Sequence, residues 1–341
     1  ATMLRAARTS WRPRAFRCTR IRRFSTTPVS SACEHSDYVR QTACVEPPAE
    51  LSALVRVLAA QGETTLSPSA RAGLHPLVIP LSRPAGAASE ETTAILRWAR
   101  AEDGTGMPVV RTGRTGLQLV ARSALEYIHR AVAEEDTASG PGAVAAAAAG
   151  TDAGGFESGS VGSDLNVHLV KRKLMFPDVC EALMARHIVK GDETAALVTG
   201  DWYCRSHFQG WASPYAHVAK QMASIGRDAE ARDLARVALH LPWWTLGPRH
   251  TYAEMAALAG CEDKTPEFVR LRLLEEATGA QQGMRRPENE QAMDAAAVFL
   301  DVAAAAGDGW EPVTPKIVEK YELAGLPQLA RFVAASAEAK A

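Results

Sequence analysis

The spacing of apolar residues differs between two long parts of this chain, and that difference limits the folds that the chain can form. Residues 63–122 contain short, β-branched or alternating runs separated by proline and glycine, which are typical of strands. After residue 164, apolar residues and alanines recur at helical spacing over long segments. We therefore predict an α+β fold, in which a small N-terminal antiparallel sheet with helices is followed by an all-α array of helical hairpins.

The first predicted domain is a small α+β domain over residues 47–136. Its opening segment, "PPAELSALVRVLAAQGE", has leucines and valines at helical spacing and ends near Gly62. Five strand-like runs follow, and Pro76 and Pro80, which bracket one of these strands, indicate an edge position. Ser123 and Glu126 then have the spacing of a capping box, which predicts a helix after the sheet.

A second predicted domain, residues 164–336, is helical-repeat-like and is joined to the first by an unusual segment. Residues 137–163 are mainly glycine, alanine and serine with few side chains to bury, which indicates a flexible linker or a surface insertion. Within the second domain, one helical pair has the spacing of a tetratricopeptide hairpin. It has glycine in the turn and small residues where the helices meet: Gly226, Ala231, Ala235 and Ala238.

Two adjacent tryptophans follow the second helix of that hairpin. Pro242 ends the helix, so Trp243 and Trp244 are expected to point in different directions. We expect one of them to cap the core near Tyr252 and Met255, and the other to be partly exposed or to lie at a domain junction. Because aromatic anchors dominate protein interfaces, Trp243 and Trp244 are the candidate protein-interface residues, with packing of both as the simpler interpretation.

The N-terminal 31 residues have the composition of an organellar transit peptide. They contain eight arginines, no aspartate or glutamate, and several serines and threonines. Arg22 precedes Phe24 in a pattern that suits mitochondrial processing, but plastid transit peptides can look similar. Removing the segment leaves 30 basic against 39 acidic residues, so the mature chain would be acidic. That charge argues against non-specific nucleic-acid binding and would suit a basic protein partner.

No pattern of residues indicates a catalytic, cofactor or metal site. The cysteines are scattered singly, and His207 and His217 lack the spacing and the third ligand of a metal site. The serine-containing run "GSVGSD" falls in the 137–163 segment, where no rigid turn could hold a nucleophile. No glycine-rich phosphate loop lies between a strand and a helix. We therefore predict no catalytic, cofactor-binding or metal-binding residues.

Four segments together resemble one known family. They are "HPLVIPLSR" (75–83), "MPVVRTGRTGLQLVARSALEYIHRAVAEED" (107–136), "LVTGDWY" (197–203) and "GRDAEARDLARVALHLPWWTLG" (226–247). In this order they resemble the green-lineage family of Protein in Chloroplast ATPase Biogenesis. The similarity runs from about residue 50 to residue 336 and is interrupted by the alanine- and glycine-rich segment.

The resemblance implies a non-catalytic auxiliary factor of the chloroplast stroma. Such a factor would help to incorporate the γ subunit into the CF1 head of the chloroplast ATP synthase, with other CF1 subunits as further partners. It implies no cofactor, and no run in the sequence is long enough to span a membrane. Two other hypotheses stay open: an organellar enzyme or small-molecule-binding protein with a site between the two domains, and a tetratricopeptide-like scaffold of the mitochondrial matrix.

Overall fold

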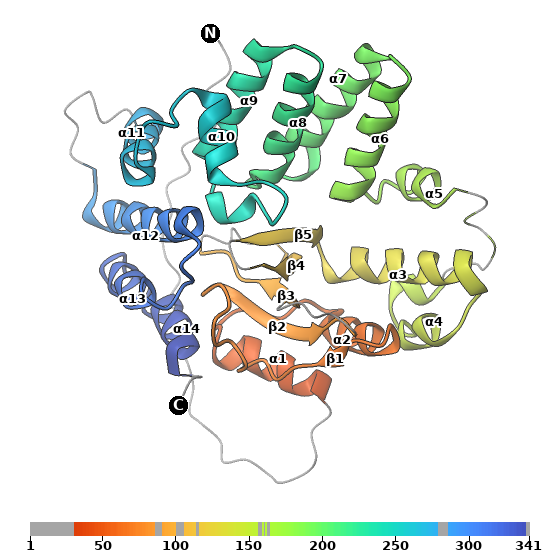
Figure 1. The fold of residues 1–341 in the computed structure, drawn as a ribbon. Helices are drawn as coiled ribbons and strands as arrows, with labels where there is room; N and C mark the ends of the chain where they lie inside the picture. The colour runs from red at the N-terminus through yellow and green to blue at the C-terminus, as the bar shows by residue number, and fades with distance from the viewer. Residues whose placement is uncertain are drawn as a thin grey trace.

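The computed structural model describes residues 31–85, 91–99, 106–113, 116–155, 159, 161, 164–278 and 286–338, and Figure 1 shows its fold. Apart from Ser31, the predicted transit peptide lies outside the described residues. The sheet lies near the centre of the molecule, with helices around it. Among the helices that the structure describes, none combines the length and hydropathy needed to cross a bilayer.

A five-stranded antiparallel sheet forms the centre of the N-terminal half. Its strands follow one another in sequence order, so that each pairs with its chain neighbour. They are β1 (Thr64–Thr65), β2 (Val78–Arg83), β3 (Thr92–Leu96), β4 (Val109–Thr112) and β5 (Leu117–Ala121). The prediction of an α+β chain with an antiparallel sheet is therefore confirmed.

The expected edge position of the proline-containing strand was wrong. β2 lies between β1 and β3, although β1 pairs only with Ser82 and Arg83. The carbonyl of Pro80 lies 3.1 Å from Nε2 of His35, a buried side chain of helix α1 (Ser31–Gln41). β1 is too short to pair with Pro80, and the carbonyl of Pro80 is contacted by His35 of α1 instead. Proline is therefore tolerated at this position of β2.

Helices α2 (Leu51–Ala60) and α3 (Ala124–Ser139) pack together beside the sheet. The buried face of α2 contains the leucines and valines that the spacing predicts. At the start of α3, the Ser123 hydroxyl accepts a hydrogen bond from the N–H of Glu126, as predicted. The Glu126 carboxylate instead accepts from the N–H of Arg122, so the two residues do not form a reciprocal capping box.

The glycine- and alanine-rich segment contains described helical structure. After the end of α3, helix α4 (Ala143–Ala147) contacts α2, and the 3₁₀ turn η1 (Asp152–Gly155) contacts α3. The carboxylate of Glu135 accepts hydrogen bonds from three N–H groups at the start of α4. Part of residues 137–163 thus packs on the first half of the chain, and the domain boundaries stay a prediction.

The second half of the described chain is helical. Its helices are α5 (Leu165–Lys171), α6 (Pro177–Val189), α7 (Glu193–Trp202), α8 (Ser213–Ser224), α9 (Asp228–His240), α10 (Tyr252–Ala259), α11 (Pro266–Thr278), α12 (Glu288–Ala306), α13 (Thr314–Leu323) and α14 (Pro327–Glu338). A π-helical turn, η2 (Tyr203–His207), follows α7, and a 3₁₀ turn, η3 (Trp243–Thr245), follows α9. Helices α6–α9 lie above β5 in Figure 1, whereas α12–α14 lie beside the sheet.

Helices α8 and α9 form the hairpin that the small-residue spacing predicts. Gly226 has a φ of 76° in the turn, a backbone conformation that favours glycine. Ala231, Ala235 and Ala238 are buried on α9, which packs closely against α8. A tetratricopeptide-like arrangement of the whole helical region stays a prediction.

Arg71 joins the last helix to the sheet region. Its guanidinium donates hydrogen bonds to the carbonyl oxygens of Phe332 at 2.5 Å and Val78 at 3.0 Å, and also to that of Pro76. The same group lies 3.8 Å from the centre of the Phe332 ring. Arg71 is 1% exposed, so these contacts are buried. They hold α14 against the N-terminal half of the chain.

Candidate functional site

A polar cleft of about 420 Å³ lies where the sheet and α3 meet the helical half. Strands β4 and β5 and helix α3 form one side of the cleft. The first turns of α6 and α8 and the loop 246–250 form the other side. The cleft is therefore built by segments that are far apart in the sequence.

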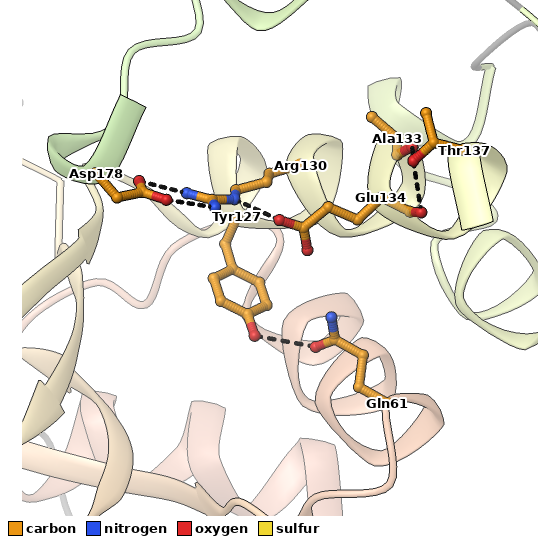
Figure 2. A network of polar contacts seen from close by, with 7 residues as sticks. All are labelled: Gln61, Tyr127, Arg130, Ala133, Glu134, Thr137 and Asp178. Carbon is orange, nitrogen blue, oxygen red and sulfur yellow. Dashed lines mark hydrogen bonds and ion pairs between the residues drawn. The ribbon is translucent and has the colours of Figure 1, made fainter. Parts of the chain in front are cut away.

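Arg130 on α3 holds the two sides together. Its two terminal nitrogens donate to the carboxylate of Asp178 at 2.7 and 2.6 Å, and its Nε donates to Glu134 at 2.7 Å. Figure 2 shows the guanidinium between these two carboxylates. Burial by itself would lower the pKa of Arg130, but the hydrogen bonds and charges of Asp178 and Glu134 raise it. Arg130 is thus a charged link between α3 and the start of α6.

Tyr127 extends this network towards α2. Its hydroxyl donates to the side-chain carbonyl of Gln61 at 2.9 Å, as Figure 2 shows. Burial raises the pKa of the phenol, so Tyr127 stays neutral at ordinary pH. Tyr127 is therefore a neutral member of the cleft lining that joins α3 to the end of α2.

Glu181 is shared between the cleft and the helical core behind it. One carboxylate oxygen accepts from the hydroxyl of Tyr203 at 2.9 Å, and the other accepts from Arg249 at 2.7 Å. Burial raises the pKa of Glu181, while Tyr203 and Arg249 oppose that change. Three of the four carboxylates in the lining are therefore already paired with an arginine, and the fourth, Glu63, accepts from the Ser82 hydroxyl.

Two polar atoms of the cleft lining have no partner within the described residues. They are Nδ1 of His250 and Nε of Arg111, which lies on β4. His250 is only 7% exposed. Behind His250 lies His217, with ring centroids 6.2 Å apart, and its Nε2 is also without a partner. Buried polar atoms are usually satisfied, so these atoms are exceptions, but each is itself covered by protein atoms and is not open to the cleft.

The described side chains offer no obvious alternative chemistry. Among them, no group of three histidine, cysteine, aspartate or glutamate side chains is placed to hold a metal ion. His217 lies beside His250 and Tyr203, and not in a cluster of metal ligands. The polar cleft is therefore the site on which a functional interpretation can be built.

Lowering the pH from 7.5 to 5.0 should destabilise the fold through its buried histidines. Burial lowers the pKa of His75 to about 3, and lowers the pKa of His217 and His250 to about 4. The unfolded chain binds protons below about pH 6.5 that the folded chain does not, so this stability is full above pH 6.5 and is lost towards pH 4. Each histidine should contribute up to about 2 kcal/mol to the loss at pH 5.

Urea unfolding at fixed pH values would measure this loss. The variant His250→Gln should show a smaller dependence on pH between 7.5 and 5.0, because one titrating group is removed. A free energy of unfolding that is constant over this range would contradict the assignment of neutral buried histidines.

Trp243 and Trp244 point in different directions, as predicted, but both are buried. Trp243 is 1% exposed and packs on Tyr252 with ring centroids 4.4 Å apart, and Met255 belongs to the same hydrophobic core. Trp244 is 4% exposed and faces the other way, towards His75 and the sheet. The expected core cap is therefore Trp243, whereas Trp244 lies between the sheet and the helical half.

The burial of Trp244 has a clear physical cause. Trp244 lies 4.5 Å from the His75 ring and 5.3 Å from the Trp98 ring, and these rings come from the first half of the chain. Such aromatic clusters bury large apolar areas within the chain itself. In the folded chain neither tryptophan is an exposed side chain, and their role at a protein interface stays a prediction.

Gly116 is required where η3 meets the sheet. A Cβ atom at this position would lie 2.6 Å from the carbonyl oxygen of Trp244, which is shorter than a van der Waals contact between these atoms allows. We expect Gly116→Ala to lower the free energy of unfolding by about 1–3 kcal/mol, because η3 must move away from the β4–β5 turn. The matched variant Gly106→Ala would place its Cβ 3.7 Å from the nearest carbonyl oxygen and should have a smaller effect. Equal urea midpoints for the two variants would contradict this packing.

The residues of the cleft were not singled out by the sequence. Arg111, Arg130, Asp178, Arg249 and His250 carry no motif, and their partners are distant along the chain. The expected interface residues, Trp243 and Trp244, do not line the cleft. The cleft does lie in the region between the two halves, where the hypothesis of a small-ligand protein placed a site.

Comparison with known proteins shows the class to which this chain belongs. Residues 33–172 match the family model described as PAB N-terminal, residues 177–262 match the PAB middle domain, and residues 267–336 match the PAB C-terminal domain. Together these models span nearly all of the described chain. The chain therefore belongs to the PAB family, as the four sequence segments predicted.

A particular relative is similar along almost its whole length. Protein IN CHLOROPLAST ATPASE BIOGENESIS, chloroplastic, from Arabidopsis thaliana is 37% identical over 322 residues. The alignment covers 92% of this chain and 94% of the relative. No solved structure matches the chain. The cleft takes side chains from the segments matched by the N-terminal and middle models, so it is formed where these two family segments meet.

Proposed function

We propose that this chain is an auxiliary factor for biogenesis of the chloroplast ATP synthase. The observation that carries the proposal is the identity of 37% over 92% of the chain to an Arabidopsis protein with that name. In this proposal the chain acts in the chloroplast stroma, helps the γ subunit to join the catalytic CF1 head, and catalyses no reaction itself. The tetratricopeptide-like stacking of its helices would then serve protein binding.

The charge of the chain supports a basic protein partner. Without residues 1–31 the chain has 30 basic and 39 acidic residues, which gives a net charge of about −9. Complementary charge increases the rate at which proteins meet and disfavours partners of the same sign. Because the surface would be acidic as a whole, we expect binding of the γ subunit to weaken as salt is added.

A pull-down from chloroplast extract tests this function. The immobilised chain should enrich the ATP synthase γ subunit, alone or with the α and β subunits, relative to an unrelated acidic protein of similar size. Because Trp243 and Trp244 are buried, variants at these positions would report folding and are unsuitable as binding controls. Failure to enrich any ATP synthase subunit at low salt would count against the proposal.

A further inference from the structure

Helix α11 carries two exposed apolar side chains on one side. Phe268 and Leu271 are 51% and 50% exposed. In the part of the chain that the structure describes, every other phenylalanine, tyrosine and tryptophan is buried or half-buried, so Phe268 is the exposed aromatic group. Residues three apart on a helix are neighbours, so these two side chains form a short apolar ridge, called here the α11 ridge.

The opposite side of α11 is packed against the rest of the protein. Val269 is 5% exposed, and the equally inaccessible Arg270 pairs with Asp301 of α12 at 2.7 Å and donates to the carbonyl of His240 on α9 at 3.1 Å. With 3.6 residues per turn, the α11 ridge points away from Val269 and Arg270. α11 lies at the periphery of the molecule in Figure 1. It is therefore apolar on its outer side as well as on its packed side, and an apolar helix face is normally covered.

The surface around the α11 ridge is acidic. Between positions 262 and 276, five acidic and two basic side chains are exposed, which gives a net charge of −3: Glu262, Asp263, Glu267, Glu275 and Glu276 against Lys264 and Arg272. Lys264 pairs with Asp263 at 2.7 Å, and Arg272 pairs with Glu275 at 3.2 Å. A partner that approaches the ridge therefore meets an excess of negative charge.

This charge distinguishes among the possible occupants of the α11 ridge. A second copy of the chain would bring an acidic surface against an acidic surface, and like charges disfavour association. An anionic bilayer surface would be repelled for the same reason. A polypeptide with lysine or arginine beside its apolar side chains would meet opposite charge. A helix suits the shape, because a ridge of residues three apart packs into the groove between the side chains of another helix.

We propose that the α11 ridge docks a basic amphipathic helix of a partner polypeptide. Apolar side chains of that helix cover Phe268 and Leu271, and its lysine or arginine side chains lie beside Glu267 and Glu276. Phe268 then supplies the aromatic anchor that the sequence analysis assigned to the two tryptophans. This inference rests on the proposed function, because the helix belongs to one of the ATP synthase subunits that the chain would bind.

Removing the α11 ridge should weaken binding and leave the fold intact, because both side chains are exposed. The test variant carries Phe268→Ser and Leu271→Ser. The control variant carries Val198→Ser on α7 and Leu323→Ser on α13, at side chains that are 65% and 60% exposed. Each immobilised chain is mixed with recombinant chloroplast ATP synthase α, β and γ subunits, and retention is measured after thermal unfolding has shown that the chain is folded.

The test variant should retain about tenfold less of the subunits than the unchanged chain does. The control variant should retain as much as the unchanged chain. Equal retention by the test and control variants would overturn the inference and leave the proposed function standing. Absence of binding to the unchanged chain would overturn both.

A photoreactive side chain on the ridge would identify the docked segment without depending on a loss of binding. p-Benzoylphenylalanine replaces Phe268 in one chain and Leu323 in a control chain, each is irradiated with the same subunits, and the linked peptides are sequenced by mass spectrometry. The replacement at position 268 should link to a segment with apolar residues three or four apart and an excess of lysine and arginine. A linked segment that is acidic, or one that links equally to position 323, would overturn the inference.

Two other occupants of the α11 ridge would also overturn the inference. A dimer of the isolated chain that the test variant dissociates, detected by analytical ultracentrifugation, would identify a second copy as the occupant. Flotation of the chain with vesicles that contain phosphatidylglycerol, lost in the test variant, would identify a membrane surface. We expect a monomer that does not float with these vesicles.

Discussion

Replacing Asp301 with asparagine is expected to lower the free energy of unfolding by about 3–5 kcal/mol. Asp301 is fully buried on α12, where one carboxylate oxygen accepts from the N–H of Trp243 at 2.6 Å and the other forms a 2.7 Å ion pair with Arg270. Burial raises the pKa of the Asp301 carboxyl to about 6 against the attraction of Arg270, so the pair is charged at pH 7.5. Asparagine keeps the volume but leaves the buried Arg270 without a counter-ion.

Urea unfolding at pH 7.5 would measure the effect, with two controls. Asp263→Asn removes an exposed partner of Lys264 and should leave the free energy of unfolding almost unchanged. The double variant Asp301→Leu with Arg270→Met should recover much of the loss, because replacing both charges removes the unpaired one. A loss for Asp301→Asn as small as that for Asp263→Asn would contradict the assigned ion pair.

Replacing Trp244 with alanine is expected to cost about 3–5 kcal/mol, because it leaves a large cavity between the two halves of the chain. The ring is 4% exposed and packs against His75 and Trp98. Loss of these contacts separates η3 from the sheet region, so thermal unfolding should shift to a lower temperature. Phe268→Ala, at a side chain that is 51% exposed on α11, is the matched aromatic control and should have a small effect.

The stability of the Trp244→Ala variant also decides how its binding data are interpreted. A Trp244→Ala chain that loses the ATP synthase subunits and also unfolds reports packing. A chain that stays as stable as the Phe268→Ala control would contradict the buried position of Trp244. For this reason the unfolding measurement must precede any binding measurement with that variant.

Periodicity predicted the class of the fold because it depends on local spacing. The alanine positions on α9 and the Ser123 cap of α3 are set by neighbours within a few residues, and both are present in the structure. The predicted edge position of β2 was wrong, because the position of this strand depends on contacts with β1 and His35. No local pattern predicts these contacts. Local reasoning is reliable where the partner is a near neighbour.

The candidate site could not be predicted for the same reason. Trp243 and Trp244 are candidates because exposed aromatic residues anchor interfaces, yet Trp244 is buried against rings from the first half of the chain and Trp243 against Tyr252. The cleft requires that β5, α3, α6 and the loop 246–250 come together. Nothing in the sequence distinguishes Arg130 and Asp178 from ordinary surface charges. The fold brings them together as an ion pair in the cleft lining.

The most direct test of the proposed biogenesis function is the level of assembled ATP synthase in chloroplasts. An Arabidopsis line that lacks the relative would express this chain behind a plastid-targeting sequence, and the amount of CF1 bound to the photosynthetic membrane would be measured. We expect the chain to restore that amount to near the level of the unmodified plant. A line in which the chain accumulates in the stroma while the amount of CF1 stays at the level of the untransformed mutant would contradict the proposed function.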